Sequence, residues 1–183
     1  MISRVLQYAI ERHRQRMELK NLSLTDELTG LYNRRGFVAL AEQQIKLSCR
    51  TKFGFLLFYI DLNNFKAIND TYGHGTGDQV LVEFAKILNM TFRESDIIAR
   101  IGEDEFVALA IQSVESSSDI LLDRLSENMK RSQAKSAESF KLSISAGIET
   151  FDPSHPCVID ELLIRADKRM YANKRGEAGS RPA

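Results

Sequence analysis

The chain has 183 residues with a formal net charge of zero at pH 7, and 43% of its residues are apolar. This length suits one domain with a substantial core. The balanced charge gives no general attraction to nucleic acid or to an anionic membrane. No apolar run approaches the roughly 20 residues of a membrane span, and the first 20 residues lack a signal-peptide pattern. Cys49 and Cys157 are too few for a disulfide framework. We therefore expect a cytoplasmic protein that neither binds nucleic acid nor inserts into a membrane.

Residues 1–24 have a helical pattern without glycine or proline. Leu6, Ile10, His13 and Met17 follow one another at spacings of four, three and four, a short heptad-like seam. Two roles remain open for this segment: a helix that pairs two chains, or a helix that packs on its own domain. Its abrupt start would also fit the end of a linker from a sensor domain upstream.

The segment after this helix predicts a second helix. Thr25 is placed to cap it, and the acidic residues that follow suit the positive end of the helix dipole. Gly30 interrupts the helix, which resumes after Arg35 and runs to about Cys49.

The rest of the chain alternates strand and helix patterns. The nearly all-apolar run at 53–60 predicts a central strand covered on both faces and ending at Asp61. The order of elements predicts an α+β fold: a ferredoxin-like, mainly antiparallel sheet flanked by helices. The further elements are helices at 63–73 and 79–92, a hairpin of 97–101 with 105–111, a helix at about 118–135, a strand at 141–151 and a helix at about 158–174. A tail at 177–183 is expected to be disordered.

Carboxylates follow the central strand and fill the hairpin turn. Asp61 stands at the end of a buried strand, where α/β proteins tend to place chemistry. If this strand lies beside the hairpin, Asp61 approaches Asp104 and Glu105, and such a group of oxygens suits Mg²⁺. A second interpretation stays open, in which Asp61 is a helix N-cap and the turn is solvated.

Residues after Asp61 suit a nucleotide. Lys66 opens a helix, where free N–H groups and a nearby ammonium favour phosphate. Asn69 and Asp78 can bind the edge of a purine, and an aspartate that accepts from N1–H and N2–H selects guanine. The stretch "YGHGTGD" (72–78) predicts a tight loop near a ligand, whereas its histidine is expected to be structural.

Four linked motifs resemble the GGDEF domain family, the diguanylate cyclases. The resemblance covers about residues 25–176. The motifs are "DELTGLYNRRGF" (26–37), "DLNNFKAINDTYGHGTGDQVL" (61–81), "RIGEDEF" (100–106) and "RADKRMYANKRG" (165–176).

The resemblance implies a homodimer in which each chain holds one GTP, and in which two GTP condense to cyclic di-GMP with loss of two pyrophosphates. It implies that Asp61, Leu62 and Asp104 hold two Mg²⁺ or Mn²⁺ ions, with Glu105 in the same catalytic cluster. Substrate binding is implied for Asn69 and Asp78 on guanine, for Lys66 and Lys174 on phosphates, and for Phe65. The helix at 1–24 would pair the domains and relay a signal from upstream.

The stretch "RESD" resembles the RxxD inhibitory site of this family. There, the arginine at the position of Arg93 pairs with guanine and phosphate of cyclic di-GMP, a bidentate geometry that lysine does not offer. Asp96 completes the motif. An exposed ion pair at a helix end is the alternative interpretation.

Two departures from the family lie outside the signature. Asn63 replaces the second aspartate of the family's DxDxFK motif, and we expect this loss to be mild. Glu177 and Ala178 stand where the family has Gly-Arg. A phosphate-binding arginine is therefore missing unless Arg175 or Arg181 replaces it.

The third departure is Glu103, which replaces the second glycine of the signature and makes it GEDEF. A type I′ turn needs a positive φ at both central residues and would penalise Glu103, whereas a type II′ turn needs it only at Gly102, so the backbone strain is survivable. A carboxylate about 4 Å from a phosphate costs about 1 kcal/mol in water and about 4 at an effective dielectric of 20. GTP binding would then be roughly fivefold to a thousandfold weaker. A Glu103 side chain that turns to solvent or toward a metal would remove much of that cost, and both alternatives stay open. Two hypotheses follow: a cyclase inhibited by its product, or a catalytically silent receptor for cyclic di-GMP or GTP.

Overall fold

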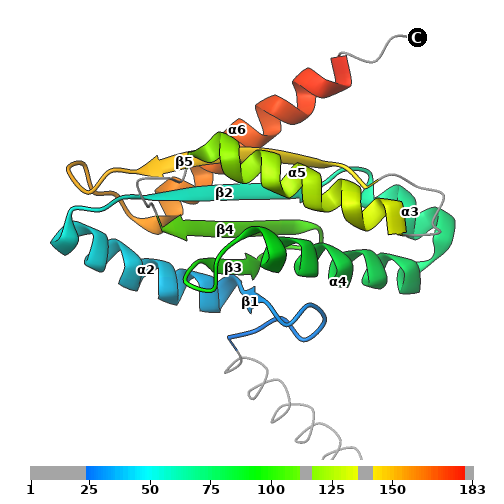
Figure 1. Ribbon diagram of the computed structural model, residues 1–183, viewed down its shortest axis with the longest axis horizontal. Coiled ribbons are helices and arrows are strands. Elements are labelled where there is room, and N and C mark those ends of the chain that lie inside the picture. The colour runs from blue at the N-terminus through cyan, green and yellow to red at the C-terminus, as the bar shows by residue number, and fades with distance from the viewer. Residues whose placement is uncertain (1–23, 112–116, 136–141, 180–183) are drawn as a thin grey trace, which may run out of the picture.

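The computed structural model describes residues 24–111, 117–135 and 142–179 (Figure 1). The helix predicted for residues 1–24 therefore lies almost wholly outside the described residues, as do residues 180–183. The elements are β1 (Tyr32–Asn33), α2 (Arg34–Thr51), β2 (Phe55–Leu62), α3 (Phe65–Tyr72), α4 (His74–Thr91), β3 (Ile97–Arg100), β4 (Glu105–Ile111), α5 (Ser118–Lys135), β5 (Ile144–Phe151) and α6 (Ile159–Gly179). None of the helices in these ranges is both long and apolar enough to span a bilayer.

The described residues form a five-stranded sheet in the order β1-β3-β4-β2-β5. β1 and β3 are parallel, and the other neighbours are antiparallel. The predicted α+β fold with a mainly antiparallel, helix-flanked sheet is confirmed.

Two apolar cores lie on opposite faces of the sheet. Alternate residues of β2 contribute to each core, because successive side chains of a strand point to opposite faces. Helices α3, α4 and α5 cover one face, and α2 and α6 cover the other. In Figure 1, α5 crosses in front of the sheet and α6 lies behind it. All eight residues of β2 are buried, as predicted for the apolar run. The predicted strand began two residues too early, because Phe53 precedes β2 and is 65% exposed.

The predicted helix that begins at Thr25 is wrong. Thr25 forms an isolated antiparallel bridge with Tyr32, and the chain between them makes a turn with Gly30 at φ 73°. The helix cap is Asn33, whose side chain accepts a 2.9 Å hydrogen bond from the Gly36 N–H. Both Thr25 and Asn33 are good N-cap residues, so local preference does not choose between them.

Three element boundaries also differ from the prediction. β2 continues to Leu62, so Asp61 lies within the strand, paired with Glu105 on β4 and Ser145 on β5. The predicted loop at 72–78 is wrong, because α4 already begins at His74. α6 runs to Gly179, five residues beyond the predicted end of the helix at 174.

Candidate active site

Three acidic residues meet at one end of the sheet. Asp61 and Glu105 are direct cross-strand partners on β2 and β4. Asp104 lies in the turn before β4, and its backbone carbonyl accepts a 3.1 Å hydrogen bond from the Leu62 N–H. The structure therefore brings together residues that are more than 40 positions apart in the sequence.

The charges of Asp61 and Asp104 are only partly balanced. Asp61 is 8% exposed, and Lys174 on α6 donates a 2.5 Å hydrogen bond to its Oδ1 atom. Burial and the neighbouring charge of Asp61 together raise the pKa of Asp104 above its usual value. The ionised form of Asp104 is thus costly in this setting, and a bound cation would remove that cost.

This donor set fits a divalent hard cation. Mg²⁺ prefers oxygen ligands and is commonly held by one or two carboxylates together with substrate phosphates. Within the described ranges, no three His, Cys, Asp or Glu side chains are grouped closely enough to hold a metal by themselves. Asp61 and Asp104 would therefore share the ion with the substrate rather than enclose it.

Glu105 is held on the α2/α6 side of the sheet. The Tyr59 hydroxyl donates a 3.1 Å hydrogen bond to its Oε1 atom. Burial, followed by the charge of Glu105, raises the pKa of Tyr59, so the phenol remains a donor. A Cβ atom at Gly102 would collide with Oε2 of Glu105. A larger residue at position 102 would therefore displace the Glu105 carboxylate from this position.

The signature turn is neither the type I′ nor the type II′ turn considered from the sequence. Positive φ angles occur at Gly30, Lys52, Asn64 and Gly73 in the described residues, and so not at Gly102 or Glu103. Backbone strain therefore gives no objection to glutamate at position 103. The side chain of Glu103 is exposed.

Arg100 links the signature turn to the N-terminal loop. Its guanidinium donates a 2.7 Å hydrogen bond to the Glu103 carbonyl and lies 3.3 Å from the Asp26 carboxylate. Asp26 also accepts hydrogen bonds from the backbone and hydroxyl of Thr29. Burial opposes ionisation of Asp26, but the Thr29 bonds and the Arg100 charge hold its pKa below the usual value.

The residues expected to bind guanine lie on α3 and α4. Asn69 Oδ1 is buried and, among the buried side-chain polar atoms of the described residues, is the one without a hydrogen-bond partner. A Cβ atom at Gly77 would collide with this oxygen, so the glycine keeps space beside it. Asp78 is exposed in the first part of α4. A buried, unpaired acceptor is costly in a folded protein and indicates a missing donor.

The remaining predicted residues are placed as follows. Lys66 is exposed in the first turn of α3, whereas the Phe65 side chain is 3% exposed and belongs to the core. No side chain caps this helix. Asn63 accepts a 2.8 Å hydrogen bond from the Ser145 hydroxyl, so it fastens the end of β2 to β5. Arg175 lies 5.9 Å over the ring of Tyr171, and Arg181 lies outside the described residues.

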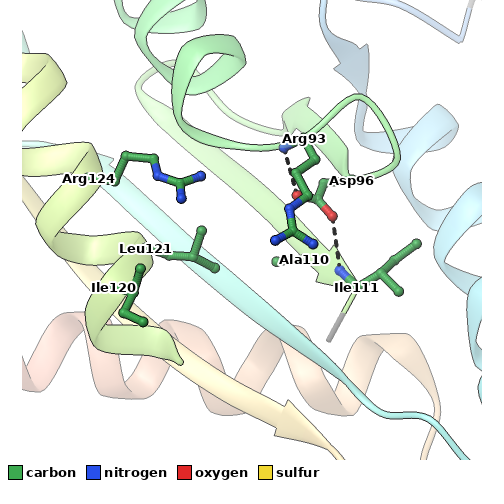
Figure 2. A pocket seen from close by; sticks show the side chains of 7 residues that line it. All are labelled: Arg93, Asp96, Ala110, Ile111, Ile120, Leu121 and Arg124. Carbon is green, nitrogen blue, oxygen red and sulfur yellow. Dashed lines mark hydrogen bonds between the residues drawn. The ribbon is translucent and has the colours of Figure 1, made fainter. Parts of the chain in front are cut away.

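The RxxD residues lie in the turn between α4 and β3, beside a cavity of about 90 Å³. Asp96 accepts hydrogen bonds from the backbone N–H groups of Arg93, at 2.8 Å, and of Ile111, at 3.0 Å. Arg124 on α5 borders the same cavity and donates to the Thr91 carbonyl at 3.2 Å. Figure 2 shows the side chains of both arginines beside it. Arg124 was not predicted as a site residue, because no local sequence pattern connects α5 with this turn.

Comparisons with known proteins agree with these motifs. A family model described as "Diguanylate cyclase, GGDEF domain" matches residues 23–180. The bifunctional diguanylate cyclase/cyclic di-GMP phosphodiesterase MucR of Pseudomonas aeruginosa is 36% identical over 167 residues, which cover 91% of this chain and 24% of MucR. The probable diguanylate cyclase DgcC of Escherichia coli K12 is 32% identical over 89% of this chain and 43% of DgcC.

A solved structure is also similar. The coiled coil and GGDEF domain of DgcB from Caulobacter crescentus, in complex with c-di-GMP, has a TM-score of 0.73 at 25% identity, and the match covers 95% of this chain and 94% of that one. The chain spans less than half the length of the two curated relatives.

Proposed function

Because the chain belongs to the GGDEF domain family, we propose that it is a diguanylate cyclase that condenses two GTP molecules into cyclic di-GMP and releases two pyrophosphates. The observation that carries this proposal is the meeting of Asp61 and Asp104 at the sheet end, where burial and then the charge of Asp61 raise the pKa of Asp104. Relatives named as cyclases support the same reaction.

Asp61 and Asp104 would hold two Mg²⁺ or Mn²⁺ ions, together with the main chain at Leu62. Such ions lower the pKa of the attacking 3′-hydroxyl and neutralise charge at the α-phosphate. The chain's own residues set the position of the acids: Asp61 is fixed by pairing on both sides within the sheet, and Asp104 by its bond to Leu62.

The other predicted residues would bind GTP. Asn69 Oδ1 would accept a hydrogen bond from a guanine N–H group, which would satisfy its buried oxygen. Asp78 would accept from the same edge of the base. Lys66 and the main chain at Phe65 would meet the phosphates at the start of α3. Lys174 would contribute a further positive charge, because it already reaches Asp61.

Two chains would act together as a homodimer, since each active site supplies half of a two-fold symmetric product. The segment at 1–24 would pair the chains and connect them to a sensor domain.

Arg93 and Asp96 would form the product-binding inhibitory site, and Arg124 would add a second guanidinium for phosphate or guanine.

A second function, a receptor for cyclic di-GMP without catalysis, is favoured by Glu103. Its added carboxylate lies on the turn that would face the phosphates, while the cavity beside Arg93 and Arg124 is formed independently of that turn.

The two functions are separated by incubating the purified chain with GTP and Mg²⁺ or Mn²⁺ and detecting cyclic di-GMP by chromatography. The cyclase predicts product from the wild type and none from Asp61→Asn. No product at high enzyme concentration, with product restored by Glu103→Gly, would favour the receptor. Calorimetry with cyclic di-GMP then tests the inhibitory site; equal affinity for wild type and Arg93→Ala would remove it.

A further inference from the structure

β5 is an edge strand, and some of its backbone carbonyls face away from the sheet. It stands last in the strand order of the described residues, where it pairs with β2. Just beyond β2, the Asn63 N–H donates a 2.8 Å hydrogen bond to the Ser143 carbonyl. Hydrogen-bonded pairs alternate along antiparallel strands. The carbonyls of Ala146 and Ile148 therefore point to the free edge of β5, where unpaired backbone groups are open to solvent or to another chain.

Two side chains on neighbouring turns of α6 bond to these carbonyls. Asn173 donates a 2.8 Å hydrogen bond to the Ala146 carbonyl, and Arg169 donates a 3.2 Å hydrogen bond to the Ile148 carbonyl. Arg169 Nε also lies 2.6 Å from Oε1 of Glu149, a residue that is 8% exposed. Residues 169 and 173 are four apart, so they share one side of the helix. Together they fasten α6 to the free edge of β5 at two points.

Gly147 lets the helix come close enough for these contacts. A Cβ atom on Gly147 would collide with the backbone of Ala166 and Met170 in α6. Ala166 and Met170 are both buried, and Lys174 is the next residue at a spacing of four. The side of α6 that packs on β5 thus continues into Lys174, whose ammonium group donates to Asp61 at the end of the sheet.

The register of α6 on β5 decides where Lys174 lies, because a slip by one helical turn would move its side chain by about 5.4 Å. We propose that Arg169 and Asn173 are positioning residues that fix this register, and so hold the ammonium group of Lys174 beside Asp61 to meet the substrate phosphates. The inference rests on the proposed active site, and it assigns a role to two side chains that do not touch the substrate.

The rate at which Lys174 is acetylated by N-hydroxysuccinimidyl acetate, followed by mass spectrometry on the full chain without nucleotide, tests this without catalysis. The ion pair with Asp61 slows acetylation in the wild type. Asn173→Ala should raise the rate about fivefold, the worth of one hydrogen bond, and Asp61→Asn gives the rate of the released lysine. Lys168 is exposed on the same helix and is the internal control, with one rate in all variants.

Arg169 is tested in the same way. Arg169→Met removes both contacts and keeps the length of the side chain, so it should raise Lys174 acetylation at least as much as Asn173→Ala does. Arg169→Lys keeps the charge and a donor and should restore most of the protection. Lys168→Met is the matched control, because it removes the same charge from an exposed position of α6; its Lys174 rate equals that of wild type.

Binding of a non-hydrolysable GTP analogue with Mg²⁺, measured by calorimetry, shows whether Asn173 acts through the lysine. Asn173→Ala should weaken binding about fivefold in the wild-type background. In the Lys174→Met background the same change should leave the affinity within about twofold, because residues that act through one another are not additive.

A Lys174 acetylation rate that stays at the wild-type value in both Asn173→Ala and Arg169→Met overturns the inference. An equal loss of affinity from Asn173→Ala in both backgrounds overturns it as well. Failure of the proposed function looks different: Lys174 acetylation then rises in both variants, while the wild type binds no GTP analogue.

Discussion

The two ends of β4 carry sites of opposite character. At its start, Asp104 is half-buried beside the carboxylate of Asp61, and burial and that neighbouring charge raise its pKa. At its end, the carboxylate of Asp96 accepts two backbone hydrogen bonds, one of them from Ile111, the last residue of the strand. A bound cation would stabilise the ionised form of Asp104, whereas the Asp96 carboxylate is already stabilised by two backbone N–H groups.

The difference shows where this protein gives up stability for function. Neutralising Asp104 should raise the stability of the fold and abolish the proposed reaction. Removing the carboxylate of Asp96 should lower the stability of the fold. Functional sites often carry such an unfavourable arrangement, which ligands relieve.

The largest expected effect is that of Asp104→Asn. Formation of cyclic di-GMP should fall at least roughly a hundredfold, comparable to the loss of one preorganised electrostatic contact to a transition state. In metal-free buffer the melting temperature should rise, because a neutral side chain avoids the repulsion by Asp61. Chromatography and calorimetry measure the two effects, and a lower melting temperature would contradict the comparison.

Asp96→Ala should destabilise the fold by about 2–3 kcal/mol, since two backbone N–H groups lose a charged acceptor. Denaturant unfolding measures this loss. Arg93→Ala provides the contrast: it keeps the backbone N–H, so stability should stay within about 0.5 kcal/mol while cyclic di-GMP affinity falls. Equal destabilisation by both variants would show that the bonds to Asp96 are not what holds this turn.

Glu103→Gly should strengthen GTP binding about fivefold. The exposed position of Glu103 indicates the high-dielectric limit, in which a carboxylate about 4 Å from a phosphate costs about 1 kcal/mol. Glu103→Gln should give most of the same gain, because φ is not positive at this residue and glycine brings no conformational advantage. Titration calorimetry with a non-hydrolysable GTP analogue compares the two variants; a gain in glycine and none in glutamine would argue for steric rather than electrostatic interference.

The smallest effects are in the pH dependence of stability without metal. Asp26 has a lowered pKa, so its stabilising contribution is present above about pH 3.8 and is lost as the pH falls through the folded value. The raised pKa of Asp104 has the opposite sign: its penalty appears as the pH rises above 3.8. Asp26→Asn should therefore lower, and Asp104→Asn raise, the melting temperature at pH 7, and both differences should shrink toward pH 3. Differences that stay constant with pH would refute this assignment.

Much of the fold was visible in the sequence because its signals are local and periodic. The apolar run of β2 and the stripe of α5 predicted those elements close to their observed bounds. The order of motifs also predicted which acids would come together. The cap at Asn33 was not predictable, because Thr25 offers the same chemistry eight residues earlier.

Other parts of the site depend on contacts that no local pattern reveals. Arg100 reaches Asp26 across 74 positions, and Tyr59 reaches Glu105 across 46. Gly102 does not have the positive φ that a type II′ turn would need, and its missing Cβ leaves room for the Glu105 carboxylate. These contacts depend on the packing of elements that are far apart in the sequence, so no local sequence pattern predicts them.

The most direct test of the proposed cyclase is to count both products of one reaction. The purified chain is incubated with GTP and Mg²⁺ at increasing enzyme concentrations, and cyclic di-GMP and pyrophosphate are measured together. Our account predicts two pyrophosphates for each cyclic di-GMP, with a rate that rises more steeply than linearly in the dilute range as chains pair. GTP that binds but yields neither product, even for Glu103→Gly at concentrations where the chain is dimeric, would contradict it.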